Sequence, residues 1–99
     1  MAKSIIFTSE AEDDSYQGYA WYESRRIGLG REFITAVDAC LQLISRNPKL
    51  YQTIYKDYRR AVVRRFPFSI IYEETDSEVT IYAIFDSRQK PNKWRERLE

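Results

Sequence analysis

The sequence predicts a single α+β domain: an N-terminal strand, a helical hairpin and then an antiparallel meander, with the helices packed on one sheet face. Two observations lead to this prediction. Apolar residues recur at helical spacing up to residue 44, whereas from residue 53 onward they alternate as they do in strands. The later segments are joined by turns so short that neighbouring strands must pair antiparallel, which is typical of layered α+β domains.

Composition limits the kinds of protein to consider. The chain has 99 residues, which suits one domain; we assign residues 1–97 to it, and Leu98-Glu99 resembles a cloning scar. The sequence holds no apolar run of the roughly 20 residues that a membrane span needs, and it begins with no leader-like segment. We therefore expect a cytoplasmic protein without membrane contact. One cysteine and no histidine predict neither a disulfide nor a metal site, and we expect no cofactor.

The first half should form one short strand and two helices. Residues 5–7 are β-branched or aromatic, and the hydroxyls of Thr8 and Ser9 follow where a helix cap is needed. The first helix has a weak apolar stripe and needs tertiary support, and the glycine-rich segment 27–30 ends it. The second helix ends at Asn47-Pro48 and has a strong stripe, made of Phe33, Val37, Cys40, Leu41 and Ile44.

The second half should form the meander. We expect strands over residues 53–56, 59–66, 69–74 and 79–85, with Asp76-Ser77 as a tight hairpin turn. Pro67 fixes the turn between Phe66 and Phe68, and we expect both rings to pack in the core. The chain then runs into a basic C-terminal stretch.

Charge is distributed unevenly along a chain whose net charge is only +1. Acidic residues gather at the start of the first helix and at the hairpin near residue 76, which leaves two locally basic runs, residues 56–65 and 88–97. Two such runs would form an anion-binding patch where they adjoin. Simpler interpretations stay open: arginines on the strand can pair with acids of the helices, and the second run also fits a soluble tail.

Two kinds of uncharged side chain were weighed as functional candidates. Cys40 lies within an apolar helical stripe with no basic neighbour, which predicts a core residue rather than a nucleophile. Trp21 stands between Tyr19 and Tyr22, and three rings within four helical positions cannot all face one core. We expect at least one ring to be exposed for solvent or a partner.

The order and spacing of several segments resemble the RelE/ParE superfamily of toxins from type II toxin–antitoxin systems, and its ParE-like branch, the plasmid stabilisation proteins, in particular. The resemblance spans nearly the whole chain. It rests on Gly30-x-x-Phe33 with Asn47-Pro48, on Arg59-Arg60, on Arg65-Phe66-Pro67-Phe68-x-Ile70-Ile71-Tyr72, and on Arg88-x-x-Pro91 with Trp94 beyond. One position departs from the pattern: Asp86 stands where ParE-like sequences commonly have histidine, and an acid there can pair with Arg88 or Lys90.

The resemblance implies a ParE-like toxin that inhibits DNA gyrase by binding and is neutralised by a cognate antitoxin with an acidic C-terminal segment. The alternative is a RelE-like ribosome-dependent mRNA endonuclease, with Arg60, Arg64 and Arg88 as phosphate ligands. A third interpretation is a degenerate, non-toxic binding module, and a homodimer is left open. Cleavage needs positioned proton-transfer groups, and no tyrosine follows Tyr82, so we favour a non-catalytic role. The expected target or antitoxin surface comprises Arg59, Arg60, Arg64, Arg65, Arg88, Lys90, Trp94 and Trp21.

Overall fold

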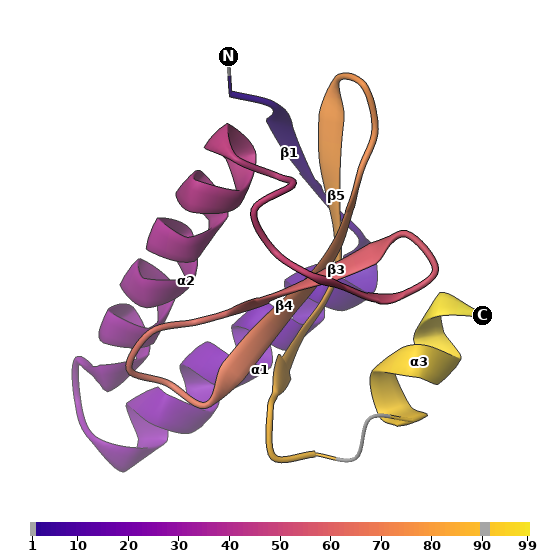
Figure 1. The fold of residues 1–99 in the computed structure, drawn as a ribbon. Coiled ribbons are helices and arrows are strands. Elements are labelled where there is room, and N and C mark those ends of the chain that lie inside the picture. The colour runs from indigo at the N-terminus through magenta and orange to yellow at the C-terminus, as the bar shows by residue number, and fades with distance from the viewer. Residues whose placement is uncertain (1, 90–91) are drawn as a thin grey trace.

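The structure is a computed structural model that describes residues 2–89 and 92–99. A five-stranded sheet in the order β1-β5-β4-β3-β2 carries α1 and α2 on one face and α3 on the other (Figure 1). The α+β fold expected from the sequence is confirmed. The elements are β1 (Ser4–Phe7), α1 (Ser9–Arg25), α2 (Leu29–Arg46), β2 (Thr53–Tyr55), β3 (Tyr58–Val62), β4 (Phe68–Glu74), β5 (Glu78–Asp86) and α3 (Asn92–Leu98).

The turn between α1 and α2 is built on a glycine and on a carboxylate from the preceding helix. Gly28 has a φ of 91°, a left-handed conformation that glycine adopts without strain, and it precedes α2 without offering a capping side chain. Glu23 of α1 supplies the missing acceptors: its carboxylate accepts hydrogen bonds from the backbone N–H of Gly28 and of Gly30 at 3.0 Å. A negative charge at this end of α2 is favoured by the helix dipole.

Replacing Glu23 with alanine is expected to lower the free energy of unfolding by about 1–2 kcal/mol, the usual cost of losing a helix cap. Two N–H groups would lose their acceptor together, and the charge at the start of α2 would be lost as well. Urea unfolding followed by circular dichroism measures the effect. Gln17→Ala, at an exposed position of the same helix, is the control, and an equal loss in both variants would contradict a capping role.

The main core lies between the helical hairpin and the sheet and is rich in aromatic rings. Phe33 is fully buried, and the rings of Tyr22, Phe66 and Phe68 surround it with centroids 4.9–5.4 Å away. The two helices approach closely where α1 has Gly18, since a Cβ there would lie 2.6 Å from Cε2 of Phe33. The packing expected for the rings on either side of the proline is therefore present, with Phe66 more deeply buried than Phe68.

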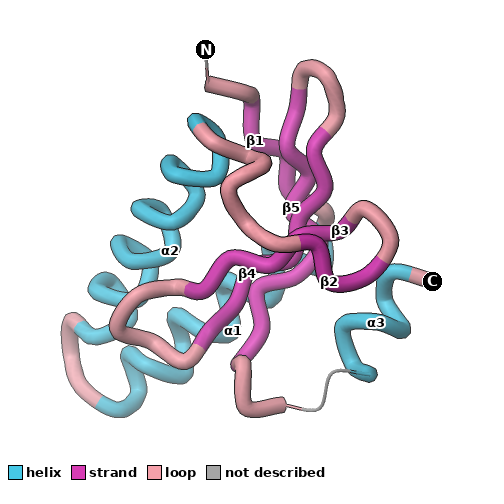
Figure 2. The backbone as a smooth tube through the Cα atoms, in the orientation of Figure 1, coloured by secondary structure: helices cyan, strands magenta, loops and turns pink. Residues whose placement is uncertain are grey.

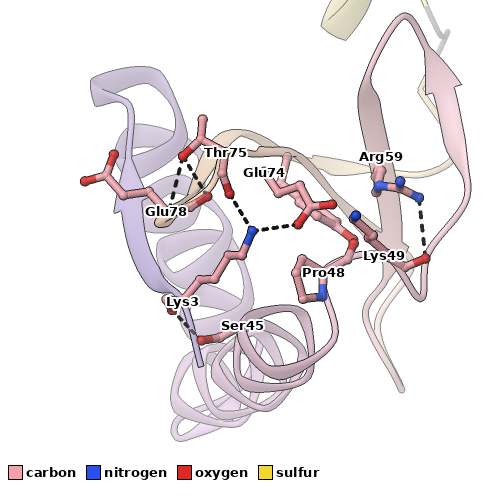
Figure 3. A network of polar contacts seen from close by, with 9 residues as sticks. Lys3, Ser45, Pro48, Lys49, Arg59, Glu74, Thr75 and Glu78 are labelled. Atoms are coloured by element: carbon pink, nitrogen blue, oxygen red, sulfur yellow. Dashed lines mark hydrogen bonds and ion pairs between the residues drawn. The ribbon is translucent and has the colours of Figure 1, made fainter. Parts of the chain in front are cut away.

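The N-terminal strand joins the sheet beside the last strand. β1 pairs with β5 in parallel, with Ser4 opposite Glu78, a pairing that the local sequence pattern does not reveal. Lys3 fastens this strand: its Nζ lies 3.0 Å from a carboxylate oxygen of Glu74, and its carbonyl accepts from Ser45 Oγ at the end of α2 (Figure 3). One lysine therefore connects the strand, the helix end and the β4–β5 hairpin.

Strand β3 is shorter than the sequence predicted, ending at Val62 rather than near residue 66. The chain then bends at residues 64–67, where Arg65 has a φ of 74°, which is incompatible with an extended strand. The bend brings Phe66 into the core and turns the chain into β4, where the N–H of Val63 donates to the carbonyl of Phe68.

The second face of the sheet, which we call the α3 face, is covered in part by α3 (Figure 2). Ile71 of β4 and Ala83 of β5 are buried there together with Trp94 of α3. The ladder between β4 and β5 skips Tyr82, and this bulge turns Ala83 toward α3 while Ile84 stays in the main core. The C-terminal stretch is therefore a docked helix, and Leu98 packs against the same cluster.

Candidate functional site

The basic residues of the first run have three different surroundings. Arg59 faces the helical side of the sheet, beside its ladder partner Tyr72, and its Nη1 donates to the carbonyl of Tyr51 at 2.6 Å. Figure 3 shows the same guanidinium reaching the carbonyl of Lys49. The half-buried Arg59 therefore holds the loop after α2 in place.

Arg60 points to the α3 face, since adjacent residues of a strand alternate between the two faces. Its side chain is exposed, and its Nε donates to Ser69 Oγ at 3.1 Å. Ser69 is fully buried, and its hydroxyl lies 2.7 Å from that of Ser87. Because Ser87 precedes Arg88 in the chain, this hydroxyl bridge joins Arg60 to the segment that carries Arg88, at the same end of the sheet. The two side chains lie on different faces, since Asp86, which binds the Arg88 guanidinium, is opposite Phe68 on the helical face.

Arg88 is held by an acid two residues earlier. Asp86 accepts through Oδ1 from the backbone N–H and the Nε of Arg88, both at 2.9 Å, and through Oδ2 from Nη2 at 2.6 Å. These hydrogen bonds from Arg88 hold the pKa of Asp86 below its ordinary value. The pairing that the sequence suggested for Asp86 and Arg88 is present, and the Arg88 side chain is 69% exposed.

A cavity of about 450 Å³ opens beside Arg88 between α1, the end of β5 and α3. Its walls combine rings, among them Trp21 and Trp94, with the cationic side chains of Lys93 and Arg97. Trp94 is 7% exposed and belongs to the cluster under α3, whereas Trp21 is 49% exposed. The exposed ring that the sequence predicted on the first helix therefore borders this cavity.

One partly buried ion pair lies in the wall of the cavity. Asp14 of α1 accepts from the backbone N–H of Ile84 at 3.0 Å and from Nη1 of Arg97 at 2.6 Å. The same Nη1 donates to the carbonyl of Tyr82. Asp14 and Arg97 therefore cap the edge of β5 beyond the end of β1 and tie α3 to α1.

Arg64 and Arg65 lie in a different place, at the rim of a groove of about 610 Å³ between α2 and the end of β3. Arg65 pairs with Glu32 of α2 at 3.2 Å and is 72% exposed. The floor of the groove is apolar, with the half-exposed side chains of Leu43 and Val62. The structure thus separates these two arginines from the cavity that Arg88 lines.

The expected single patch is therefore distributed over separate surfaces. Arg88, Trp21 and Trp94 line the cavity, Arg64 and Arg65 border the groove, and Arg60 lies on the α3 face beside Ser69. Lys90, also expected at this site, lies outside the described residues. Sequence analysis missed Asp14, Lys93, Ser69 and Ser87. A pattern of alternating residues could have placed Ser69 on the same face as Arg60 only after the strand register was known.

The thiol of Cys40 and the phenol of Tyr22, which lie near these surfaces, do not ionise readily at neutral pH. Burial raises the pKa of Cys40 to about 11, as expected for a core residue, although its helix borders the groove. Burial also raises the pKa of Tyr22, and the charge of Asp86 adds to the rise. Both groups therefore stay protonated around pH 7.

No helix among the described residues is both long enough and apolar enough to cross a membrane. That finding concerns the helices of residues 2–89 and 92–99.

Comparison with known proteins by sequence identifies a family. A family model described as the ParE toxin of type II toxin–antitoxin system, parDE, matches residues 5–91. Toxin ParE2 of Mycobacterium tuberculosis, in strains CDC 1551 and H37Rv, is 25% identical over 93 residues, which cover 93% of this chain and 89% of the relative.

Two solved structures share the fold. The chromosomal ParDE system from P. aeruginosa aligns with a TM-score of 0.62 at 18% identity, over 86% of this chain and 96% of that one. The toxin–antitoxin complex RelBE2 from Mycobacterium tuberculosis aligns with a TM-score of 0.62 at 16% identity, over 87% and 99%. Since the family model covers most of the chain, this protein belongs to the ParE toxin family of type II toxin–antitoxin systems.

Proposed function

We propose that this toxin inhibits DNA gyrase by binding to it, without catalysing a reaction, and that a cognate antitoxin neutralises it. The fold occurs in both a ParDE and a RelBE system and therefore does not distinguish their targets. Family membership and the side chains of the site support gyrase. The observation that carries the proposal is the hydroxyl bridge through Ser69 and Ser87, which joins Arg60 to the segment that carries Arg88 at one end of the sheet. Two guanidinium groups there suit recognition of an anionic surface.

Binding is favoured over RNA cleavage by the chemistry around the two arginines. Cleavage through the 2′-hydroxyl needs a base to remove its proton and an acid to protonate the leaving oxygen. The neighbouring hydroxyls of Ser69 and Ser87 hydrogen bond but do not ionise at neutral pH, and the raised pKa of Tyr22 makes that phenol a poor base. The site can therefore hold an anion more readily than it can transfer protons.

The groove beside α2 supports an antitoxin partner. Apolar side chains form its floor, and the cationic side chains of Arg31, Arg64 and Arg65 border it. β2 pairs only with the first part of β3, at Tyr58 and Arg59. The outer edge of β3 at Val62 is therefore not paired with β2. An amphipathic acidic segment that orders on binding would bury the floor and pair with the rim.

Purified toxin is expected to inhibit gyrase in a supercoiling assay and to lose roughly five- to tenfold in potency with Arg60→Ala, the usual effect of removing one charge-assisted contact. Arg46→Ala, an exposed arginine in the last turn of α2, is the control with the same charge change. Addition of the cognate antitoxin should abolish inhibition.

A parallel translation reaction, read by primer extension, tests the other interpretations. Discrete mRNA cuts with unaffected gyrase would replace the proposal with the RelE-like endonuclease. Activity in neither reaction would favour a non-toxic binding module.

A further inference from the structure

The carboxylate of Asp86 is held in place by the sheet, whereas its partner is not. Asp86 is the last residue of β5 and lies opposite Phe68 in the ladder, and its carbonyl accepts from the N–H of Gln89 at 3.0 Å in the turn that follows. The adjacent residue is fixed as well, since the N–H of Ser87 donates to the carbonyl of Pro67. The backbone that carries the carboxylate is thus fixed and its side chain is 21% exposed, while the long side chain of Arg88 projects from a turn and is 69% exposed.

Both oxygens of Asp86 occupy the guanidinium. Oδ1 accepts from Nε and Oδ2 accepts from Nη2. The two N–H groups with which an arginine binds a carboxylate in bidentate geometry are therefore already used by a residue of the same chain. The pair has no net charge, and its attraction for an outside anion is correspondingly reduced.

We propose that Asp86 is an internal competitor for the carboxylate group of a partner protein that Arg88 binds, and that it weakens this contact. The inference rests on the proposed function, which places Arg88 on the target-binding surface. The bound carboxylate of Asp86 itself indicates the chemistry that fits: two oxygens in the plane of the guanidinium. A partner's acidic side chain gains this contact only after Asp86 releases it.

A second ion pair in the same cavity shows why Arg88 is the exchangeable cation. Arg97 is 29% exposed, is paired with Asp14, and also donates to the carbonyl of Tyr82, so its release would remove the counter-ion of Asp14 and the hydrogen bond to that carbonyl together. Release of Arg88 leaves Asp86 with the backbone N–H of residue 88 and with access to solvent. Exchange with an outside anion is therefore easier at Arg88.

Neutralising the competitor tests the inference directly. Asp86→Asn keeps the size and one acceptor oxygen but removes the charge, and it is expected to bind malonate roughly fivefold more tightly than the unaltered protein, in keeping with an exposed ion pair. Binding is followed at constant ionic strength by the NMR signal of the Arg88 Nε–H group during a malonate titration. A second titration uses inorganic phosphate.

Three comparisons decide the outcome. Asp76→Asn, an exposed acid in the β4–β5 turn, makes the same change in net charge and should leave malonate binding unchanged. Asp86→Asn with Arg88→Gln, followed by a backbone amide of the site, should bind no more tightly than Arg88→Gln alone. An equal gain in the Asp76 variant, no gain in the Asp86 variant, or a gain for phosphate alone would overturn the inference.

Gyrase inhibition separates this inference from the proposed function. If both hold, Asp86→Asn also inhibits supercoiling more strongly than the unaltered toxin. Tighter malonate binding with no inhibition by any variant would leave the internal competition intact and remove gyrase as the target. Unchanged malonate binding with normal gyrase inhibition would overturn the internal competition and leave gyrase as the target.

Discussion

Phe33→Ala is expected to lower the free energy of unfolding by about 3–5 kcal/mol, the range for removing a buried aromatic side chain. Single domains are stable by only about 5–15 kcal/mol, so this variant should be largely unfolded in mild denaturant. Phe33 is fully buried and lies at the centre of the ring cluster that joins both helices to the turn before β4.

The effect is measured by urea unfolding with circular dichroism as the signal. Trp21→Ala is the matched control, since it removes a larger ring that is 49% exposed, and it should cost less than about 1 kcal/mol. Equal losses in the two variants would mean that the ring cluster does not organise the domain.

Asp14→Ala is expected to cost about 2–3 kcal/mol and to release α3 from the sheet. The substitution leaves the N–H of Ile84 without an acceptor and Arg97 without its counter-ion, and an unpaired buried group costs more than the pair contributes. Hydrogen exchange measured by mass spectrometry should show that exchange in α3 is faster in this variant than in the unaltered protein, with a smaller increase in α2. Global unfolding by urea gives the loss in stability.

Two further variants separate the possible causes. Asp13→Ala makes the same charge change at the neighbouring exposed position and should leave α3 protected. Asp14→Asn keeps an acceptor for Ile84 and should lose less than Asp14→Ala. Protection of α3 that is equal in all three variants would contradict the anchoring role of Asp14.

The sequence predicted the elements whose side chains repeat at a clear period. The stripe from Phe33 to Ile44 marks the buried face of α2, and the two strands of the last hairpin lie where the alternation placed them. α3 was not predicted, because its seven residues include only Trp94 and Leu98 as apolar anchors and the rest of its surface is charged or polar. The parallel pairing of β1 with β5 has no local sequence signal, since it depends on where a distant strand ends.

The candidate site was predicted less well than the fold, for a related reason. Arginine residues were correctly identified as the notable side chains, but adjacent positions such as Arg59 and Arg60 point to opposite faces of β3. The surroundings of each arginine depend on residues of other segments that hydrogen bond on the same face, such as Ser69 and Ser87 beside Arg60. Local patterns specify the spacing of charges, whereas the sheet register decides which of them meet.

The parallel pairing of β1 and β5 also has a consequence for synthesis of the protein. Ser4 leaves the ribosome early, but its sheet neighbour Glu78 is made only when most of the chain has been translated. Contacts so distant in sequence form late and slow folding. A nascent chain that stops before β5 lacks both the strand that pairs with β1 and Arg88, so neither the complete sheet nor this cationic side chain is present until β5 and the turn after it have been made.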